Sequence, residues 1–98
     1  MIDTTVVKVR FSEATTVLSF IEYCIAAEND IYRDDPYDSK VYGDCIALLW
    51  RSKRALEVML AKARHPYIVA VTIEFPWPED VLREYVNGFI DTLKEVFN

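Results

Sequence analysis

The chain has 98 residues, of which 52% are hydrophobic and 13% aromatic, and its formal net charge is −5. That much apolar surface offsets the entropy of ordering, which excludes an intrinsically disordered chain. A chain of this length supports one hydrophobic core, so residues 1–98 are expected to form a single domain. The negative charge disfavours nucleic-acid binding, which needs a field that attracts phosphates.

Nothing in the sequence predicts a membrane segment or an export signal. No apolar run approaches the ~20 residues that are needed to cross a bilayer. The first residues, 1–5, lack the basic and apolar regions of a signal peptide. Cys24 and Cys45 occupy apolar positions of helical patterns, where free cysteines are usually small buried hydrophobes. We therefore expect a cytoplasmic protein without a disulfide and without a membrane partner.

The first two elements are predicted to be a strand and a helix. Residues 6–11 alternate between apolar and basic or polar side chains, which is typical of a half-buried strand. Ser12 follows at a position suited to a helix N-cap, and apolar residues then recur at helical spacing to about Asn29. Residues 30–38 hold four Asp and one Pro, which favour turns. We expect a surface loop of low local stability over that segment.

A long second helix is expected over residues 40–64, capped by Asp38 or Ser39. Besides its main apolar stripe it carries a second one, displaced around the helix axis. The second stripe consists of Tyr42, Ile46 and Trp50. One stripe suffices to pack a helix on its own domain, so the second indicates either burial on two sides or an exposed partner surface.

The last two elements are predicted to be a strand and a third helix. His65 and the proline after it end the second helix, and residues 67–75 then alternate as the strongest strand of the chain. A third helix begins after Trp77, and its apolar stripe runs to Phe97, which predicts that the whole helix belongs to the core. The resulting order is β-α-α-β-α with antiparallel strands, an α+β two-layer domain with one long central helix.

Residues that carry enzyme chemistry are few and unclustered. His65 is the only histidine, and its place at a helix end suits contact with the terminal carbonyls. Neither cysteine has a partner at metal-ligand spacing, and residues 30–38 lack the glycine and glutamate of a calcium loop. Glu22, Glu28 and Glu57 lie on helix faces where solvated acids are expected. We expect no enzyme activity, no metal and no cofactor.

Charge is distributed unevenly along the chain. Residues 28–44 carry a net charge of −4, residues 45–65 carry +4, and residues 66–98 carry −4. The bases of the middle segment are Arg51, Lys53, Arg54, Lys62 and Arg64. Acids at the start of a helix and bases at its end complement the helix dipole. The other interpretation is that acidic and basic segments meet across a partner boundary and steer docking.

The first functional hypothesis is a small acidic, non-catalytic protein-interaction module that acts by binding a protein partner, as a homodimer. Accessory, adaptor or inhibitor proteins, including viral or plasmid-borne ones, are of this kind. Its support is the second apolar stripe together with a two-stranded sheet, whose unpaired edges invite another chain. The expected interface residues are Tyr42, Ile46, Trp50, Arg51 and Arg54. The alternative for Trp50 is that it fills the core of its own chain.

The second hypothesis is a binder of a small anionic ligand or nucleotide. Arg51, Arg54 and Arg64 would hold a phosphate or carboxylate, and Trp50, Tyr42 or Trp77 would stack on a ring. Weak RNA binding through the same basic face is a third hypothesis, and the net charge disfavours it. A concave site that holds Trp50 beside the arginines favours a ligand, whereas a flat surface favours a protein partner.

Overall fold

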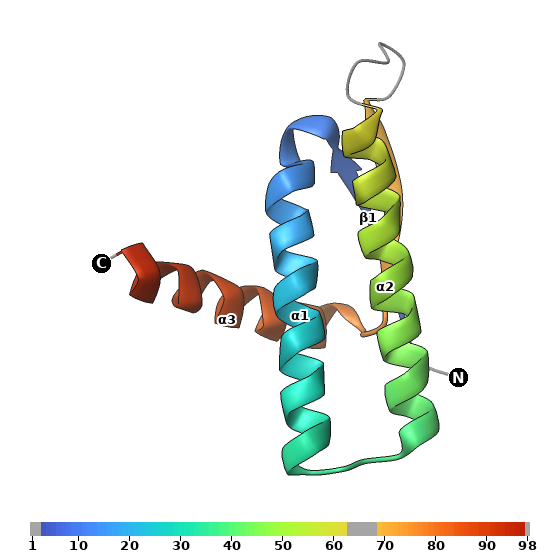
Figure 1. Ribbon diagram of the computed structural model, residues 1–98, viewed down its shortest axis with the longest axis vertical. Helices are drawn as coiled ribbons and strands as arrows, with labels where there is room; N and C mark the ends of the chain where they lie inside the picture. The colour runs from blue at the N-terminus through green and yellow to red at the C-terminus, as the bar shows by residue number, and fades with distance from the viewer. Residues whose placement is uncertain (1–2, 63–68, 98) are drawn as a thin grey trace.

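The structure is a computed structural model that describes residues 3–62 and 69–97. Its elements follow the order β-α-α-β-α, which confirms the predicted α+β class with two antiparallel strands and a long central helix. The elements are β1 (Thr5–Arg10), the 3₁₀ turn η1 (Phe11–Glu13), α1 (Ala14–Asp34), α2 (Ser39–Ala61), β2 (Ala70–Phe75) and α3 (Glu79–Phe97). Figure 1 shows α1 and α2 side by side as a hairpin, with the sheet on one side of it and α3 crossing α1.

The two strands pair antiparallel and turn one face toward the helices. Val9 of β1 lies opposite Val71 of β2. The side chains of Val9 and Ile73 are buried on the helix side of the sheet, with exposed fractions of 1% and 3%. The intervening Lys8 and Thr72 form a pair that is exposed on the other side. The period of two in the sequence therefore predicted the correct inward face of this sheet.

The core lies between the helical hairpin and the sheet. Its largest fully buried side chains are Ile21, Leu49, Leu56, Met59, Val9 and Cys24. One buried polar side chain ties α2 to β2, because the Ser52 hydroxyl donates a hydrogen bond of 2.7 Å to the carbonyl of Glu74. A buried hydroxyl needs such a partner, so this contact also sets how the helix sits on the strand.

The first helix is longer than the sequence predicted. It continues to Asp34 and ends where Asp35, which precedes a proline, leaves the helical region with φ −143° and ψ 78°. In the last turn the ring of Tyr32 stacks on Tyr42 of α2, with centroids 4.1 Å apart. This contact between the helices outweighs the turn preference of the aspartates. The loop expected over residues 30–38 is therefore confined to the four residues between α1 and α2.

The two predicted helix caps have different outcomes. Ser12 lies within η1, and α1 begins only at Ala14, so the prediction that Ser12 is the N-cap is wrong. The residue at the N-cap position of α1 is Glu13, the last residue of η1. Asp38 caps α2 as predicted, since its carboxylate accepts hydrogen bonds from the amides of Lys40 at 2.8 Å and Val41 at 3.1 Å.

The junction between α2 and β2 falls partly outside the described residues. Residues 63–68, which include Arg64, His65 and Tyr67, are not among those that the structure describes. The helix α2 ends at Ala61, three residues before the predicted Arg64, so its predicted end at His65 is wrong. The predicted start of the second strand lies in the segment that is not described. The described part of the strand begins at Ala70, and the amide of Phe11 donates to the carbonyl of Val69 at 2.9 Å.

The first half of α3 packs on α1 through aromatic rings. The ring of Phe89 contacts those of Phe20 and Tyr23, with centroids 5.5 and 5.6 Å apart. Gly88 permits this close approach, because a Cβ at that position would lie 2.5 Å from the Tyr23 hydroxyl. Leu82, one heptad before Phe89, is 8% exposed. This half of the helix therefore belongs to the core.

The second half of α3 extends beyond the body of the protein. Ile90, Leu93 and Val96 are 42%, 37% and 70% exposed, and Figure 1 shows this end projecting away from α1. The prediction that the whole helix lies in the core is therefore wrong. The physical reason is that α3 crosses α1 instead of running along it, so only its first turns lie over the other helix.

Removal of residues 90–98 is expected to leave the body folded. The deleted apolar side chains that the structure describes are largely exposed, so the free energy of unfolding should fall by no more than about 1 kcal/mol. The measurement is urea denaturation followed by circular dichroism. A matched deletion that starts at Val81 removes the buried half of the helix as well and should abolish cooperative unfolding. If deletion of residues 90–98 alone abolished cooperative unfolding, this placement of α3 would be wrong.

Candidate functional site

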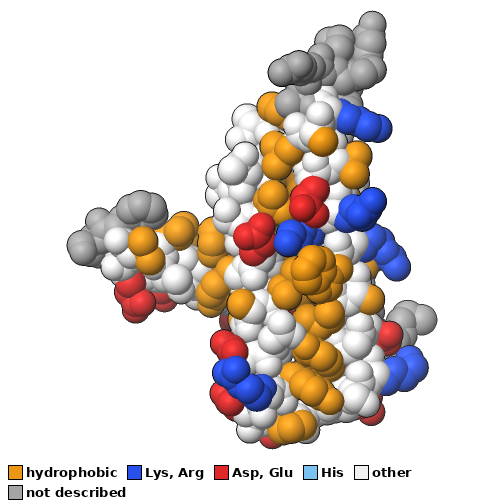
Figure 2. Space-filling model, viewed as in Figure 1, with side chains coloured by type: hydrophobic (Ala, Val, Ile, Leu, Met, Phe, Trp, Pro, Cys, Tyr) orange, Lys and Arg blue, Asp and Glu red, His pale blue; other side chains and the backbone are white. Residues whose placement is uncertain are grey.

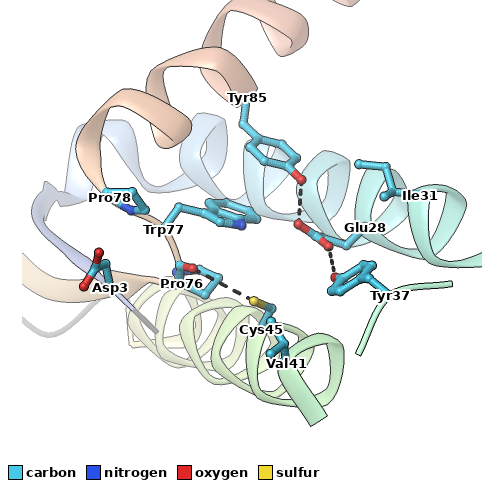
Figure 3. Close-up of a pocket in the computed structure, with 10 residues that line it drawn as sticks. All are labelled: Asp3, Glu28, Ile31, Tyr37, Val41, Cys45, Pro76, Trp77, Pro78 and Tyr85. Carbon is cyan, nitrogen blue, oxygen red and sulfur yellow. Dashed lines mark hydrogen bonds between the residues drawn. The ribbon is translucent and has the colours of Figure 1, made fainter. Parts of the chain in front are cut away.

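A cleft of about 320 Å³ opens where the three helices meet the segment that joins β2 to α3 (Figure 3). Its lining residues come from all three helices and from three of the segments that precede or join the elements, so the cleft exists only once the chain has folded. The side chains that define its chemistry are Asp3, Glu28, Tyr37, Cys45, Trp77 and Tyr85. This cleft holds the only buried carboxylate among the described residues, and we therefore treat it as the candidate ligand site.

Glu28 lies on the core side of α1 and is only 4% exposed. Two tyrosine hydroxyls donate to its carboxylate, Tyr37 to Oε2 at 2.6 Å and Tyr85 to Oε1 at 2.5 Å. These are the lengths of hydrogen bonds that a negative charge strengthens. The three residues come from α1, from the loop after it and from α3, so the carboxylate joins three segments at one point (Figure 3).

The pKa values of both tyrosines are raised by burial and by their contact with Glu28. Burial raises the pKa of Tyr85 far above the usual value for a phenol, and the hydrogen bond to Glu28 and its negative charge raise this pKa further. The pKa of Tyr37 is raised by the same causes in the same order. Both hydroxyls therefore keep their protons at neutral pH and act as donors to Glu28.

The wall of the cleft is built around Trp77. This side chain is 7% exposed, and its ring stacks on that of Tyr85 with centroids 4.0 Å apart and an angle of 13° between the planes. The hydroxyl of Thr5 donates to the carbonyl of Trp77 at 2.7 Å, which anchors the segment before α3 to β1. Prolines on both sides of Trp77 restrict its backbone. The indole is thus held in place by packing and by its backbone.

The described cysteines are not reactive groups. Cys45 lines the cleft, and burial, followed by the charges of Glu28 and Asp44, raises the pKa of its thiol to about 11. Cys24 is fully buried, and burial raises the pKa of its thiol even more. Both remain neutral thiols at physiological pH, whereas the thiolate is the nucleophile and metal ligand. In residues 3–62 and 69–97, no group of three His, Cys, Asp or Glu side chains is placed to hold a metal ion.

The second apolar stripe of α2 does not form one surface. Trp50 is 50% exposed on the outer side of α2, where the Lys53 ammonium lies 4.6 Å from the centre of its ring. Ile46 is partly buried and packs against the core, and Tyr42 is half-buried by its stack on Tyr32. Figure 2 shows apolar side chains along the face of the α1–α2 hairpin, with charged groups beside them. Trp50 is therefore the solvent-exposed residue of the stripe, and it does not fill the core.

The arginines predicted to bind an anion are only partly brought together. Arg51 and Arg54 are both exposed on α2, and Arg64 lies outside the described residues. Arg51 lines a small hollow of about 180 Å³ between α2 and β2 that also contains Glu74. A carboxylate beside the arginine weakens its attraction for a phosphate or carboxylate ligand. Trp50 does not line this hollow.

Sequence reasoning missed the hydrogen-bonded group of Glu28, Tyr37 and Tyr85. Glu28 was expected to be a solvated acid, but it lies three residues after Ile25 and four after Cys24, on the same helix face as these buried side chains. That spacing was the available signal. The sequence contained no comparable signal for Tyr37 and Tyr85, which are nine and 57 residues away from Glu28.

No family model matches this chain, and neither a curated protein nor a solved structure matches it. In the described ranges, no helix is both long and apolar enough to cross a membrane. The function is therefore inferred from the side chains themselves.

Proposed function

We propose that this chain is a non-catalytic protein-interaction module that binds a second copy of itself through the outer half of α3. The observation that supports this is the apolar face of α3, which continues unbroken past the edge of the body. Its members are Leu82, Val86, Phe89, Leu93 and Val96, spaced alternately four and three residues apart. This is the spacing of a seam between packed helices. The first three pack in the core, and the last two are exposed.

A second copy suits this face because the charged side chains of the outer half of α3, from residue 90 onward, lie away from the apolar face. By helical geometry Asp91, Lys94 and Glu95 lie on the side opposite Leu93 and Val96. The residues that flank the apolar face of the outer half, Thr92 on one side and Ile90 on the other, are uncharged. Two copies related by a twofold axis near Leu93 would bring apolar side chains together antiparallel, without placing like charges in contact.

The expected affinity follows from the size of the contact. The outer half, from residue 90 onward, spans about two turns and about 12 Å. Stable dimers bury about 1,200 Å² or more, and two such short segments bury less than that, which is typical of weak, transient contacts. We therefore expect a reversible dimer with a dissociation constant of about 1–100 μM, whose accessory, adaptor or inhibitor role depends on the paired form.

The test is the molar mass by light scattering from about 5 to about 500 μM, for the wild-type chain and two matched variants. Leu93→Asp places a charge in the proposed seam and should give a folded monomer across the range. Trp50→Asp makes the same change on the outer side of α2, the surface that the sequence predicted, and should leave the dimer intact.

Two outcomes would reject the proposal. A wild-type chain that stays monomeric at the highest concentration would show that the apolar face of α3 is not a self-association surface. A monomer produced by Trp50→Asp but not by Leu93→Asp would place the interface on α2 instead. Circular dichroism of each variant verifies that the change of mass is not a consequence of unfolding.

The anionic-ligand hypothesis has weaker support. Arg51 shares its hollow with Glu74, and Arg54 is exposed without lining that hollow. Trp50 does not line the hollow that holds Arg51; it is half-exposed, and the Lys53 ammonium lies over its ring. The interaction module is therefore the function that the geometry favours.

A further inference from the structure

The carboxylate of Glu28 is buried without a positive partner among the described residues. The ion pairs in residues 3–62 and 69–97 involve Arg33, Lys40 or Arg83, all of them exposed. Both donors to Glu28 are neutral hydroxyls. A buried charge is costly unless a counter-charge compensates it. The carboxylate therefore lacks the counter-charge that buried acids ordinarily have.

The same carboxylate retains capacity for a ligand. Each of its oxygens has two lone pairs, and each accepts one tyrosine hydrogen bond, so one acceptor position on each oxygen is unused. Glu28 also lines the cleft, which gives a small molecule a path to it. Figure 3 shows the carboxylate between Tyr37 and Tyr85, on the opposite side of Trp77 from Asp3.

The rest of the cleft favours a cation over an anion. Asp3 lines it at the end away from Glu28, and no Lys or Arg is among the described lining residues (Figure 3). Three of the lining side chains are aromatic, namely Tyr37, Trp77 and Tyr85. Aromatic faces attract ammonium groups through their negative electrostatic potential. The pocket therefore combines a buried negative charge with aromatic walls.

The lining also distinguishes an organic cation from a metal ion. Calcium and magnesium need six or more oxygen ligands, whereas most of this lining is aromatic, aliphatic or proline. A volume of about 320 Å³ is at the lower end of the range for small-molecule sites. It suits an ammonium group that carries one ring or a short alkyl chain.

We propose that this cleft binds a small organic ammonium ion, whose N–H groups donate to Glu28 and whose apolar substituent packs against Trp77. Binding supplies the counter-charge that the described residues do not provide to this carboxylate. The proposal is independent of self-association through α3, because neither Leu93 nor Val96 lines the cleft.

The first experiment uses the wild-type chain and NMR titration with phenethylammonium chloride. The expected result is a saturable shift of the Trp77 indole signal, while the signal of Trp50, which is outside the cleft, stays unchanged. The neutral analogue 2-phenylethanol and sodium chloride at equal ionic strength serve as controls and should give no saturable shift. Equal binding of the alcohol and the ammonium, or no shift of Trp77 with either, would overturn the proposal.

The second experiment identifies the charge that is responsible. Glu28→Gln keeps the shape of the side chain and an oxygen that accepts from a tyrosine, but it removes the charge. It should weaken phenethylammonium binding by about tenfold or more. Glu22→Gln makes the same change at an exposed position of α1 and should leave the affinity unchanged. If Glu28→Gln is folded by circular dichroism and binds as tightly as the wild-type chain, the assignment of Glu28 is wrong.

Discussion

Trp77→Ala is expected to lower the free energy of unfolding by about 3–5 kcal/mol. The indole is 7% exposed, stacks on Tyr85 and packs where β1, α3 and the cleft meet. Its removal leaves a cavity that the prolines on either side prevent the backbone from closing. A small domain has a total stability of about 5–15 kcal/mol, so the variant should be close to unfolded in urea denaturation.

Trp50→Ala is the matched control for this loss. The same change at a half-exposed tryptophan should alter the stability by about 1 kcal/mol or less, which includes the loss of the contact with Lys53. Circular dichroism reports unfolding in both variants and does not depend on either indole. Equal destabilisation by the two substitutions would mean that Trp50 is buried, contrary to the structure.

Stability should also fall steeply above about pH 9. The pKa values of Tyr37, Tyr85, Cys24 and Cys45 are raised in the folded chain, chiefly by burial, and that of Cys45 rises from 9.0 to about 11. The folded state therefore holds these protons more tightly than the unfolded chain does. The stabilisation is complete below the unfolded pKa values and is lost as the pH rises through the folded values.

Tyr85→Phe tests which group is responsible for this loss. At about pH 7.5 the variant should be less stable by about 1–3 kcal/mol, because Glu28 loses a donor. Between about pH 10 and 11 its stability should fall less steeply than that of the wild-type chain, since one proton fewer is released. Urea denaturation at a series of pH values measures both effects. An unchanged slope in Tyr85→Phe would remove this tyrosine from the explanation.

Local patterns predicted those features that depend on neighbouring residues. Alternation in residues 6–11 and 67–75 predicted two strands. The strand β1 overlaps the first range with a shift of one residue, and the described part of β2 lies within the second. The Asp38 cap was predictable because a cap acts over three residues of chain. Residues 30–34 were predicted incorrectly, since a stack between Tyr32 and Tyr42 on the next helix extends α1. Propensity does not include such a contact.

The sequence by itself determined the class of fold, the order of the elements and which faces of the strands are buried, because these follow from periodicity over a few residues. Only the tertiary structure decided the two features on which our two proposals rest. The crossing of α3 over α1 leaves Leu93 and Val96 outside the body, although they continue the four- and three-residue spacing of Leu82, Val86 and Phe89, which pack in or against the core. The enclosure of Glu28 depends likewise on tyrosines from distant parts of the chain, because burial is a property of the packed elements and not of the residue.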